Sequence, residues 1–154
     1  MLRLVLAWLH LLALGIGLGA VIYRGSALRE IPAAGALQRV FRSDALWGIS
    51  ALIWLVTGLW RLFGETEKSV QYYMTNHVFF AKMGLFVLVL LLELWPMVTL
   101  MRWRRAHGSA TVAGSVADPA TAKRLAMISH IEALLIVMIV FAAVTMARGF
   151  GTMH

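Results

Sequence analysis

Five ionisable side chains interrupt the apolar stretches of this sequence. A charged residue at the centre of a lipid bilayer costs about 3 kcal/mol on insertion scales, so each such residue needs a reason to be kept. Imidazoles and amines are ligands for a cofactor metal, and histidines and carboxylates also carry protons. The five residues are His10, Lys82, Glu93, His130 and Glu132, and His77 lies at the edge of one stretch.

The depths of these residues along their apolar runs predict two polar levels. A helix rises about 1.5 Å per residue. His10 lies six residues inside its run and Lys82 four residues inside its own, from ends on the same side. His130 and Glu132 enter from the opposite side, and Glu93 lies between the centre and that side. Lys82 and Glu93 are eleven residues apart, so they share one helix face, which should point into a bundle.

One face of the first run combines a histidine with a small residue. His10, Gly17 and Arg24 recur every seven residues, so all three are candidates to contact a cofactor on this face. A glycine two turns from a histidine leaves room for something flat, so His10 is a candidate axial ligand of haem iron. Lys82 or His77, at similar depth, is the candidate partner. The alternative is a structural histidine that is hydrogen bonded to a hydroxyl or carbonyl of a neighbouring helix.

The other polar residues also have more than one interpretation. Lys82 has a stem long enough to reach the near interface. Glu93 is either protonated, paired with a cation or a carrier of protons, and Pro96 frees a backbone carbonyl near it. His130 and Glu132 point about 200° apart. Both face the interior only if neighbours flank their helix on two sides, or if the protein forms a homo-oligomer.

The elements that must position these residues are membrane-spanning helices. Of the 154 residues, 61% are hydrophobic and 14% are charged, so lipid must be the solvent. A span takes about 20 apolar residues. Asp118-Pro119 is typical of a helix N-cap, so the last helix should begin before it enters the bilayer. We predict an all-α four-helix bundle, a single transmembrane domain (1–154), with spans at about 4–23, 45–63, 78–101 and 125–146.

Composition excludes several functional classes. The sequence has no cysteine, which excludes disulfides, thiolate metal sites and a cysteine nucleophile. The net charge of +7 would suggest nucleic-acid binding in a soluble protein. Here the cations lie in the connections between apolar runs, where they meet anionic lipid, so the expected partner is membrane lipid and not nucleic acid.

The charges of the connections predict the orientation. The first connection carries Arg24, Arg29, Arg39 and Arg42, and the third carries Arg102, Arg104, Arg105, Lys123 and Arg124. The middle connection balances two cations, Arg61 and Lys68, against Glu65 and Glu67. The positive-inside rule places both basic connections in the cytoplasm. We therefore predict a multi-pass protein of the bacterial inner membrane with both termini outside the cytoplasm.

Three stretches resemble the HemJ-type family of membrane protoporphyrinogen oxidases. They are WLHLLALGIGLGAVIYR (8–24), LQRVFRSDALWGISALIWLVTGLW (37–60) and HVFFAKMGLFVLVLLLE (77–93). That family has a histidine in its first span, a lysine early in its third and an acidic residue opening its last. The resemblance assigns these roles to His10, Lys82 and Glu132. It implies haem b as cofactor and the oxidation of protoporphyrinogen as activity.

The sequence departs from that family at two places. The family's Asn-Glu-x-Pro is replaced by His130-Ile131-Glu132-Ala133, and Glu93 with Pro96 is not part of its pattern. Haem binding could therefore persist without the enzymatic activity. The chain also resembles, over its whole length, an uncharacterised family of predicted four-span bacterial membrane proteins, and that resemblance implies no function.

The leading hypothesis is a haem-b-binding membrane protein that is redox-active. His10 would ligate the iron, and Lys82 would be the second ligand or the partner of a haem propionate. Glu93, Glu132 and His130 would handle protons or a substrate, and electrons would pass to a membrane acceptor, because nothing here binds a nicotinamide or flavin. The alternatives are a small proton-coupled transporter or channel along the Lys82–Glu93 face, and an accessory subunit of a membrane complex.

Overall fold

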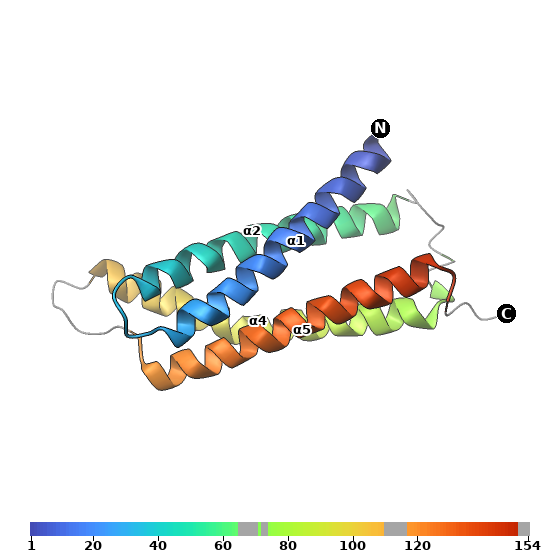
Figure 1. The fold of residues 1–154 in the computed structure, drawn as a ribbon. Coiled ribbons are helices and arrows are strands. Elements are labelled where there is room, and N and C mark those ends of the chain that lie inside the picture. The colour runs from blue at the N-terminus through green and yellow to red at the C-terminus, as the bar shows by residue number, and fades with distance from the viewer. Residues whose placement is uncertain (65–70, 72–73, 110–116, 151–154) are drawn as a thin grey trace.

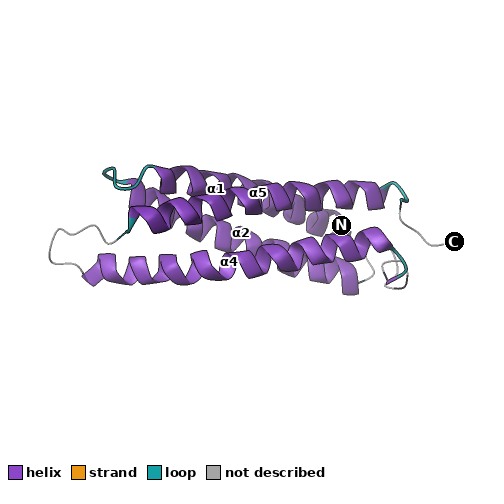
Figure 2. Ribbon diagram, turned by 90° about the horizontal axis from the view of Figure 1, so that it is seen from below, coloured by secondary structure: helices purple, strands orange, loops and turns teal. Residues whose placement is uncertain are grey.

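Four long helices make up the structure, a computed structural model that describes residues 1–64, 71, 74–109 and 117–150 (Figures 1 and 2). Each helix contains one predicted apolar run and extends beyond it. Lys68, Glu65 and Glu67, whose charges enter the orientation argument, lie outside the described residues. The predicted all-α four-helix bundle is confirmed. Its helices are α1 (Leu2–Arg29), α2 (Ala36–Phe63), α4 (His77–Ser109) and α5 (Pro119–Ala147).

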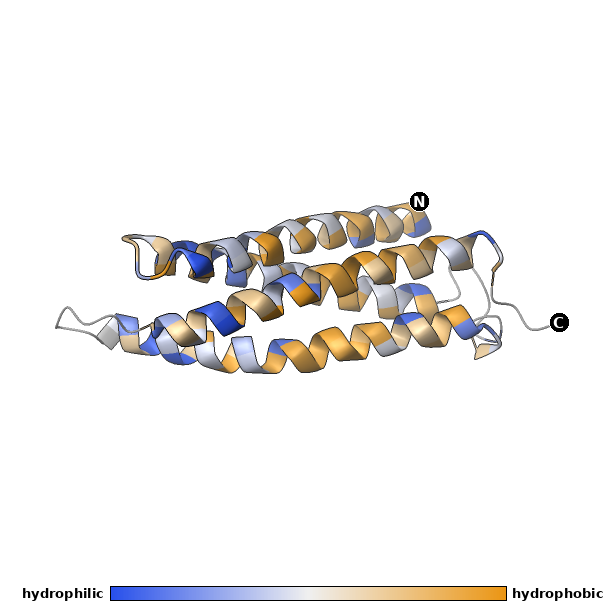
Figure 3. Cartoon of the chain, turned by 60° about the horizontal axis from the view of Figure 1, so that its bottom comes forward, coloured by the Kyte–Doolittle hydropathy of each residue, from blue (hydrophilic) through white to orange (hydrophobic). Residues whose placement is uncertain are grey.

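Every helix is long and apolar enough to cross a bilayer. A helix satisfies its backbone hydrogen bonds internally, as the hydrocarbon region of a membrane requires. Hydrophobic residues cover the central lengths of the helices, and hydrophilic ones gather toward their ends (Figure 3). The outward side chains are large and apolar, so the protein is a multi-pass membrane protein whose surface contacts lipid. Among these exposed residues are Ile49, Leu52, Val56, Leu88, Leu91, Leu134 and Phe141.

The helices are joined so that the two ends of the bundle differ. The end of α1, the start of α2, the end of α4 and the start of α5 lie at one end of the bundle, called the loop end here. The start of α1 and the end of α5 lie at the other end, called the terminal end (Figure 1). The α1–α2 turn includes Gly35, whose φ of 75° is in the left-handed region that glycine adopts readily. Arg39 and Glu30 form an ion pair across this turn.

The start of α5 has the cap that its sequence predicts. Asp118 accepts hydrogen bonds from the backbone N–H of Ala120 at 3.4 Å and of Thr121 at 2.8 Å, and Pro119 is the first helical residue. The Thr121 hydroxyl also donates to this carboxylate. These bonds hold the pKa of Asp118 below its usual value. The cap lies outside the predicted span, so α5 begins before the apolar run, as expected.

The interior consists of two apolar clusters at different levels. α1 packs against α2 and α5, and α4 packs against α5. One cluster, toward the centre, includes Val21, Trp47, Trp54, Val89, Leu135, Ile136 and Ile139. The other, toward the loop end, includes Leu28, Val40, Phe41, Leu100, Trp103 and Leu125.

Candidate functional site

A fully buried arginine lies between the two apolar clusters. The Arg24 Nε donates to the Ser129 hydroxyl at 3.1 Å. Nη1 donates to Asp44 at 3.0 Å and to Glu93 at 2.7 Å, and Nη2 donates to Glu93 at 2.8 Å and to Glu132 at 2.7 Å. A guanidinium has five N–H donors, so every donor of this buried cation is used. These five residues are called the Arg24 cluster below.

The Arg24 cluster joins all four helices. Arg24 comes from α1, Asp44 from α2, Glu93 from α4, and Ser129 and Glu132 from α5. In each helix a member of the cluster lies between residues of the two apolar clusters: Arg24 between Val21 and Ala27, Asp44 between Phe41 and Trp47, Glu93 between Val89 and Leu100, and Ser129 between Ala126 and Ala133. Apolar packing therefore flanks this polar layer on both sides.

The charges of the layer do not balance if every group is ionised. Three carboxylates surround Arg24, and among the described residues the one further cation within ion-pairing distance of them is Arg104, whose Nη2 lies 3.4 Å from Asp44. The Arg104 side chain is 48% exposed, whereas those of Arg24 and Glu132 are fully buried. Within the described chain, the buried Oε1 of Glu132 has no hydrogen-bond partner.

His130 lies beside this layer without joining it. Its Nδ1 donates to the Ala126 carbonyl of the preceding turn at 2.5 Å. Its ring contacts Gly25 so closely that a Cβ there would be 2.6 Å from the imidazole. His130 and Glu132 thus both meet α1, and Glu132 also lies next to Glu93 of α4. Helices α1 and α4 both pack against α5, so neighbours flank it on two sides. This is one of the two conditions under which the sequence allowed both side chains to face the interior.

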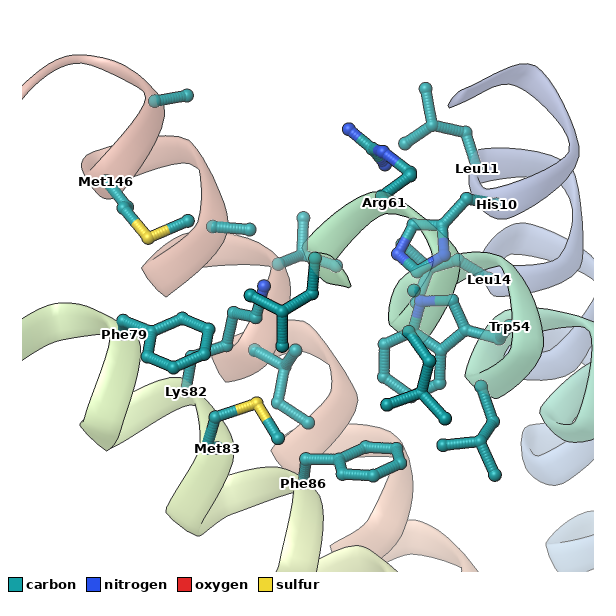
Figure 4. A pocket seen from close by; sticks show the side chains of 18 of the residues that line it. His10, Leu11, Leu14, Trp54, Arg61, Phe79, Lys82, Met83, Phe86 and Met146 are labelled. Atoms are coloured by element: carbon teal, nitrogen blue, oxygen red, sulfur yellow. The ribbon is translucent and has the colours of Figure 1, made fainter. Parts of the chain in front are cut away.

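A cavity of about 490 Å³ lies toward the terminal end and has walls from all four helices. It is called the terminal cavity below. His10 and Lys82 both line it, and Figure 4 shows them reaching in from facing walls. The remaining walls are mainly apolar and aromatic, with Leu14, Trp54, Phe79, Met83, Phe86 and Ile139 among them.

Neighbouring contacts favour one tautomer of His10. The Nδ1 of His10 lies 2.9 Å from the Thr57 hydroxyl oxygen. That hydroxyl is also placed to donate its single hydrogen to backbone carbonyls of its own helix, Ile53 at 2.7 Å and Trp54 at 3.2 Å. We therefore assign the proton of the His10–Thr57 hydrogen bond to Nδ1, which leaves the lone pair on Nε2. Gly58 lets the ring approach, since a Cβ there would lie 3.2 Å from its Cε1.

Two cations and an indole complete the polar lining of the terminal cavity. The Lys82 Nζ lies 5.9 Å from the centre of the Phe79 ring, and Arg61 lines the same cavity. Trp54 stands beside His10 with its ring centre 5.8 Å away (Figure 4). Among the described residues the buried indole N–H of Trp54 meets no acceptor. The cavity therefore offers a nitrogen ligand and positive charge in a mainly apolar lining.

Three residues expected near a cofactor lie elsewhere. Trp47 fills the space beside Gly17, where a Cβ would be 3.1 Å from the indole, so our expectation of room for a flat molecule there was wrong. All five N–H donors of Arg24 are bonded to other members of the Arg24 cluster. His77 is the exposed first residue of α4 and is not among the residues that line the terminal cavity.

Sequence reasoning missed several partners. It counted Arg24 as a loop or cofactor residue, and it did not select Asp44, Ser129, Thr57 or Arg61. One signal was present: Arg24 shares the seven-residue repeat of His10, a face that should point inward.

The chain belongs to a family described as predicted membrane proteins (DUF2214), which matches residues 2–151. This finding confirms the resemblance to an uncharacterised four-span membrane family. Neither the comparison with curated proteins nor the comparison with solved structures found a match.

Removal of the buried guanidinium should strongly destabilise the fold. Arg24→Met leaves buried carboxylates without their cation, which costs about 3–5 kcal/mol in comparable buried ion pairs. The free energy of unfolding, measured in mixed detergent micelles, should fall by that amount. Arg42→Met, at an exposed position of α2, is the matched control and should change it by less than about 0.5 kcal/mol. Equal effects of the two substitutions would contradict a structural role for the Arg24 cluster.

Proposed function

We propose that this protein binds haem b in the terminal cavity, with the Nε2 of His10 as an axial ligand of the iron, and that it exchanges electrons with a membrane acceptor. The observation that carries the proposal is the hydrogen bond from His10 Nδ1 to Thr57, inside a cavity shared with Lys82 and Arg61. A histidine ligand usually donates its other ring N–H to a neighbouring acceptor, which sets its tautomer and orientation. Thr57 is such an acceptor.

The size and lining of the terminal cavity fit a porphyrin. Its volume of about 490 Å³ is within the range of cavities that hold small molecules and cofactors, roughly 300–1,000 Å³. A porphyrin is a broad apolar plate with two carboxylates at one edge. Apolar and aromatic walls suit the plate, and Lys82 and Arg61 suit the carboxylates.

Lys82 is better suited to a propionate than to the iron. Ligation would need a neutral amine, but the Nζ of Lys82 lies over the face of Phe79, where the ring quadrupole favours an ammonium group. An ammonium attracts a carboxylate and does not ligate iron. The two roles that the sequence left open for Lys82 thus resolve, in this proposal, to the propionate partner.

The bound haem would supply one-electron chemistry, and the residues of the chain would position it. Thr57 holds the His10 ring, and the apolar walls exclude water. Glu93, Glu132 and His130 belong to a different level, because Glu93 is eleven residues and therefore about 16 Å along α4 from Lys82. The proposal consequently assigns these three residues no acid–base step on a ligand of the terminal cavity. Electron exchange fits this arrangement better than proton removal from a bound substrate.

The cations of the loop end support an orientation. Arg24 no longer contributes to the loop charge, because it is buried among carboxylates. The basic residues that remain near the loop end still outnumber those near the terminal end. We place the loop end in the cytoplasm of a bacterium and the terminal cavity in the outer half of its inner membrane.

His10→Ala should remove the haem. Wild-type protein purified from haem-replete cells should show a Soret band and, after dithionite reduction, α and β bands. His10→Ala should lose them while keeping its helical circular dichroism. His77→Ala, which changes an exposed histidine outside the cavity, is the matched control and should keep the spectrum. A colourless wild-type protein would refute the proposal.

Thr57→Val should weaken haem binding without unfolding α2. Loss of an outer partner of a metal ligand typically lowers metal affinity by about 10–100-fold, and we expect that range in a titration of apoprotein with haem. Thr145→Val is the control, because Thr145 donates to the Ala142 carbonyl of its own helix in the same way. Unchanged affinity in Thr57→Val would mean that the hydrogen bond does not orient an iron ligand.

The absence of cysteine from the sequence makes the orientation simple to test. Leu2→Cys places a thiol at the exposed start of α1, and Ala34→Cys places one in the exposed α1–α2 turn. A membrane-impermeant maleimide should label Leu2→Cys in intact spheroplasts, and Ala34→Cys only after the membrane is permeabilised. The reverse pattern would refute the proposed orientation.

A further inference from the structure

The Arg24 cluster has one negative charge too many for its surroundings. Two guanidinium groups, Arg24 and Arg104, face three carboxylates from three different helices. A net charge inside a low-dielectric layer is costly, and one bound proton brings the sum to zero. Ser129 is neutral, and the Nδ1 of His130 is bonded to the Ala126 carbonyl and not to a carboxylate of the cluster.

The geometry indicates which carboxyls hold the proton. The Nη2 of Arg24 donates to Glu93 at 2.8 Å and to Glu132 at 2.7 Å, so one nitrogen holds both side chains together. The two carboxyls therefore lie side by side at this nitrogen, one from α4 and one from α5. The fully buried Glu132 has one oxygen bonded to Arg24 and a second, Oε1, that has no partner in the described part of the chain. A proton would give this oxygen a hydrogen bond to donate.

We infer that Glu93 and Glu132 form a proton-binding site that holds one shared proton at neutral pH, with Arg24 as its fixed counter-charge. A proton from water adds to a carboxylate oxygen of the pair, and no other bond forms or breaks. Asp44 lies between two cations, Arg24 and Arg104, so we assign the proton to the Glu93–Glu132 pair and not to Asp44. Asp44 and Arg104 also continue the cluster toward the loop end, where the proton can equilibrate with solvent.

The site is independent of the proposed haem. It is built from residues that do not line the terminal cavity, and it lies at a different level of the bundle. It gives the chain a group that takes up and releases protons inside the membrane. Buried ionisable groups of membrane proteins commonly mark proton or ion pathways.

Infrared spectroscopy tests the inference directly. An isolated glutamate is ionised at pH 7. The purified protein at pH 7 should nevertheless show the C=O stretch of a protonated carboxylic acid, shifted when H₂O is replaced by D₂O. Glu93→Gln and Glu132→Gln should each lose the band, because the two carboxylates that remain are balanced by the two guanidinium groups of Arg24 and Arg104. Glu30→Gln, at an exposed acid that pairs with Arg39, is the control and should keep it.

Each outcome is decisive. The wild-type protein alone suffices to refute the inference: absence of a D₂O-sensitive acid band at pH 7 overturns it, whatever the variants do. A band that survives both Glu93→Gln and Glu132→Gln belongs to another residue and overturns it as well. The Gln variants are isosteric and neutral, and an amide N–H replaces the shared proton, so each should retain its helical circular dichroism. A band lost in both and kept in Glu30→Gln supports the shared proton.

Discussion

The buried guanidinium of Arg24 constrains the rest of the structure. An unpaired charge cannot stay in a low-dielectric interior, so each of the other helices must bring a polar partner to the same level. Asp44, Glu93 and Glu132 do so, and the five N–H donors leave little freedom in how the helices meet. In lipid, apolar packing alone gives weak preference for one helix arrangement, because the hydrocarbon tails are as apolar as the side chains. The Arg24 cluster supplies the specificity that packing lacks.

Two helices carry residues of both polar levels. α1 contributes His10 and Arg24, which are fourteen residues apart on one face, and α4 contributes Lys82 and Glu93. Between the levels lies the central apolar cluster, which includes Trp54 on its cavity side. The same helices therefore position both sites, although no side chain belongs to both.

The fold followed from the sequence because lipid leaves few choices. Four apolar runs of about 20 residues can only be helices that cross a bilayer, and the Asp118-Pro119 signal placed the start of α5 correctly. The depth of each polar residue in the membrane could also be predicted, since the rise per residue of a helix is constant. It predicted that His10 and Lys82 lie at one level, and both line the terminal cavity.

The residues that each polar side chain contacts could not be predicted from the sequence in the same way. The depth of a residue along its helix and the helix face it occupies predict where its side chain points. They do not predict which residue of a neighbouring helix it contacts, because the order and rotation of the helices depend on packing. Gly17 illustrates this limit: a small residue on an inward face is equally consistent with a ligand and with a close indole, and Trp47 occupies the space. Arg24 illustrates the same limit, in this case for a residue whose buried partners were missed. Charge counting treated it as a loop residue, although its repeat with His10 placed it on the inward face, where a cation requires carboxylates from neighbouring helices.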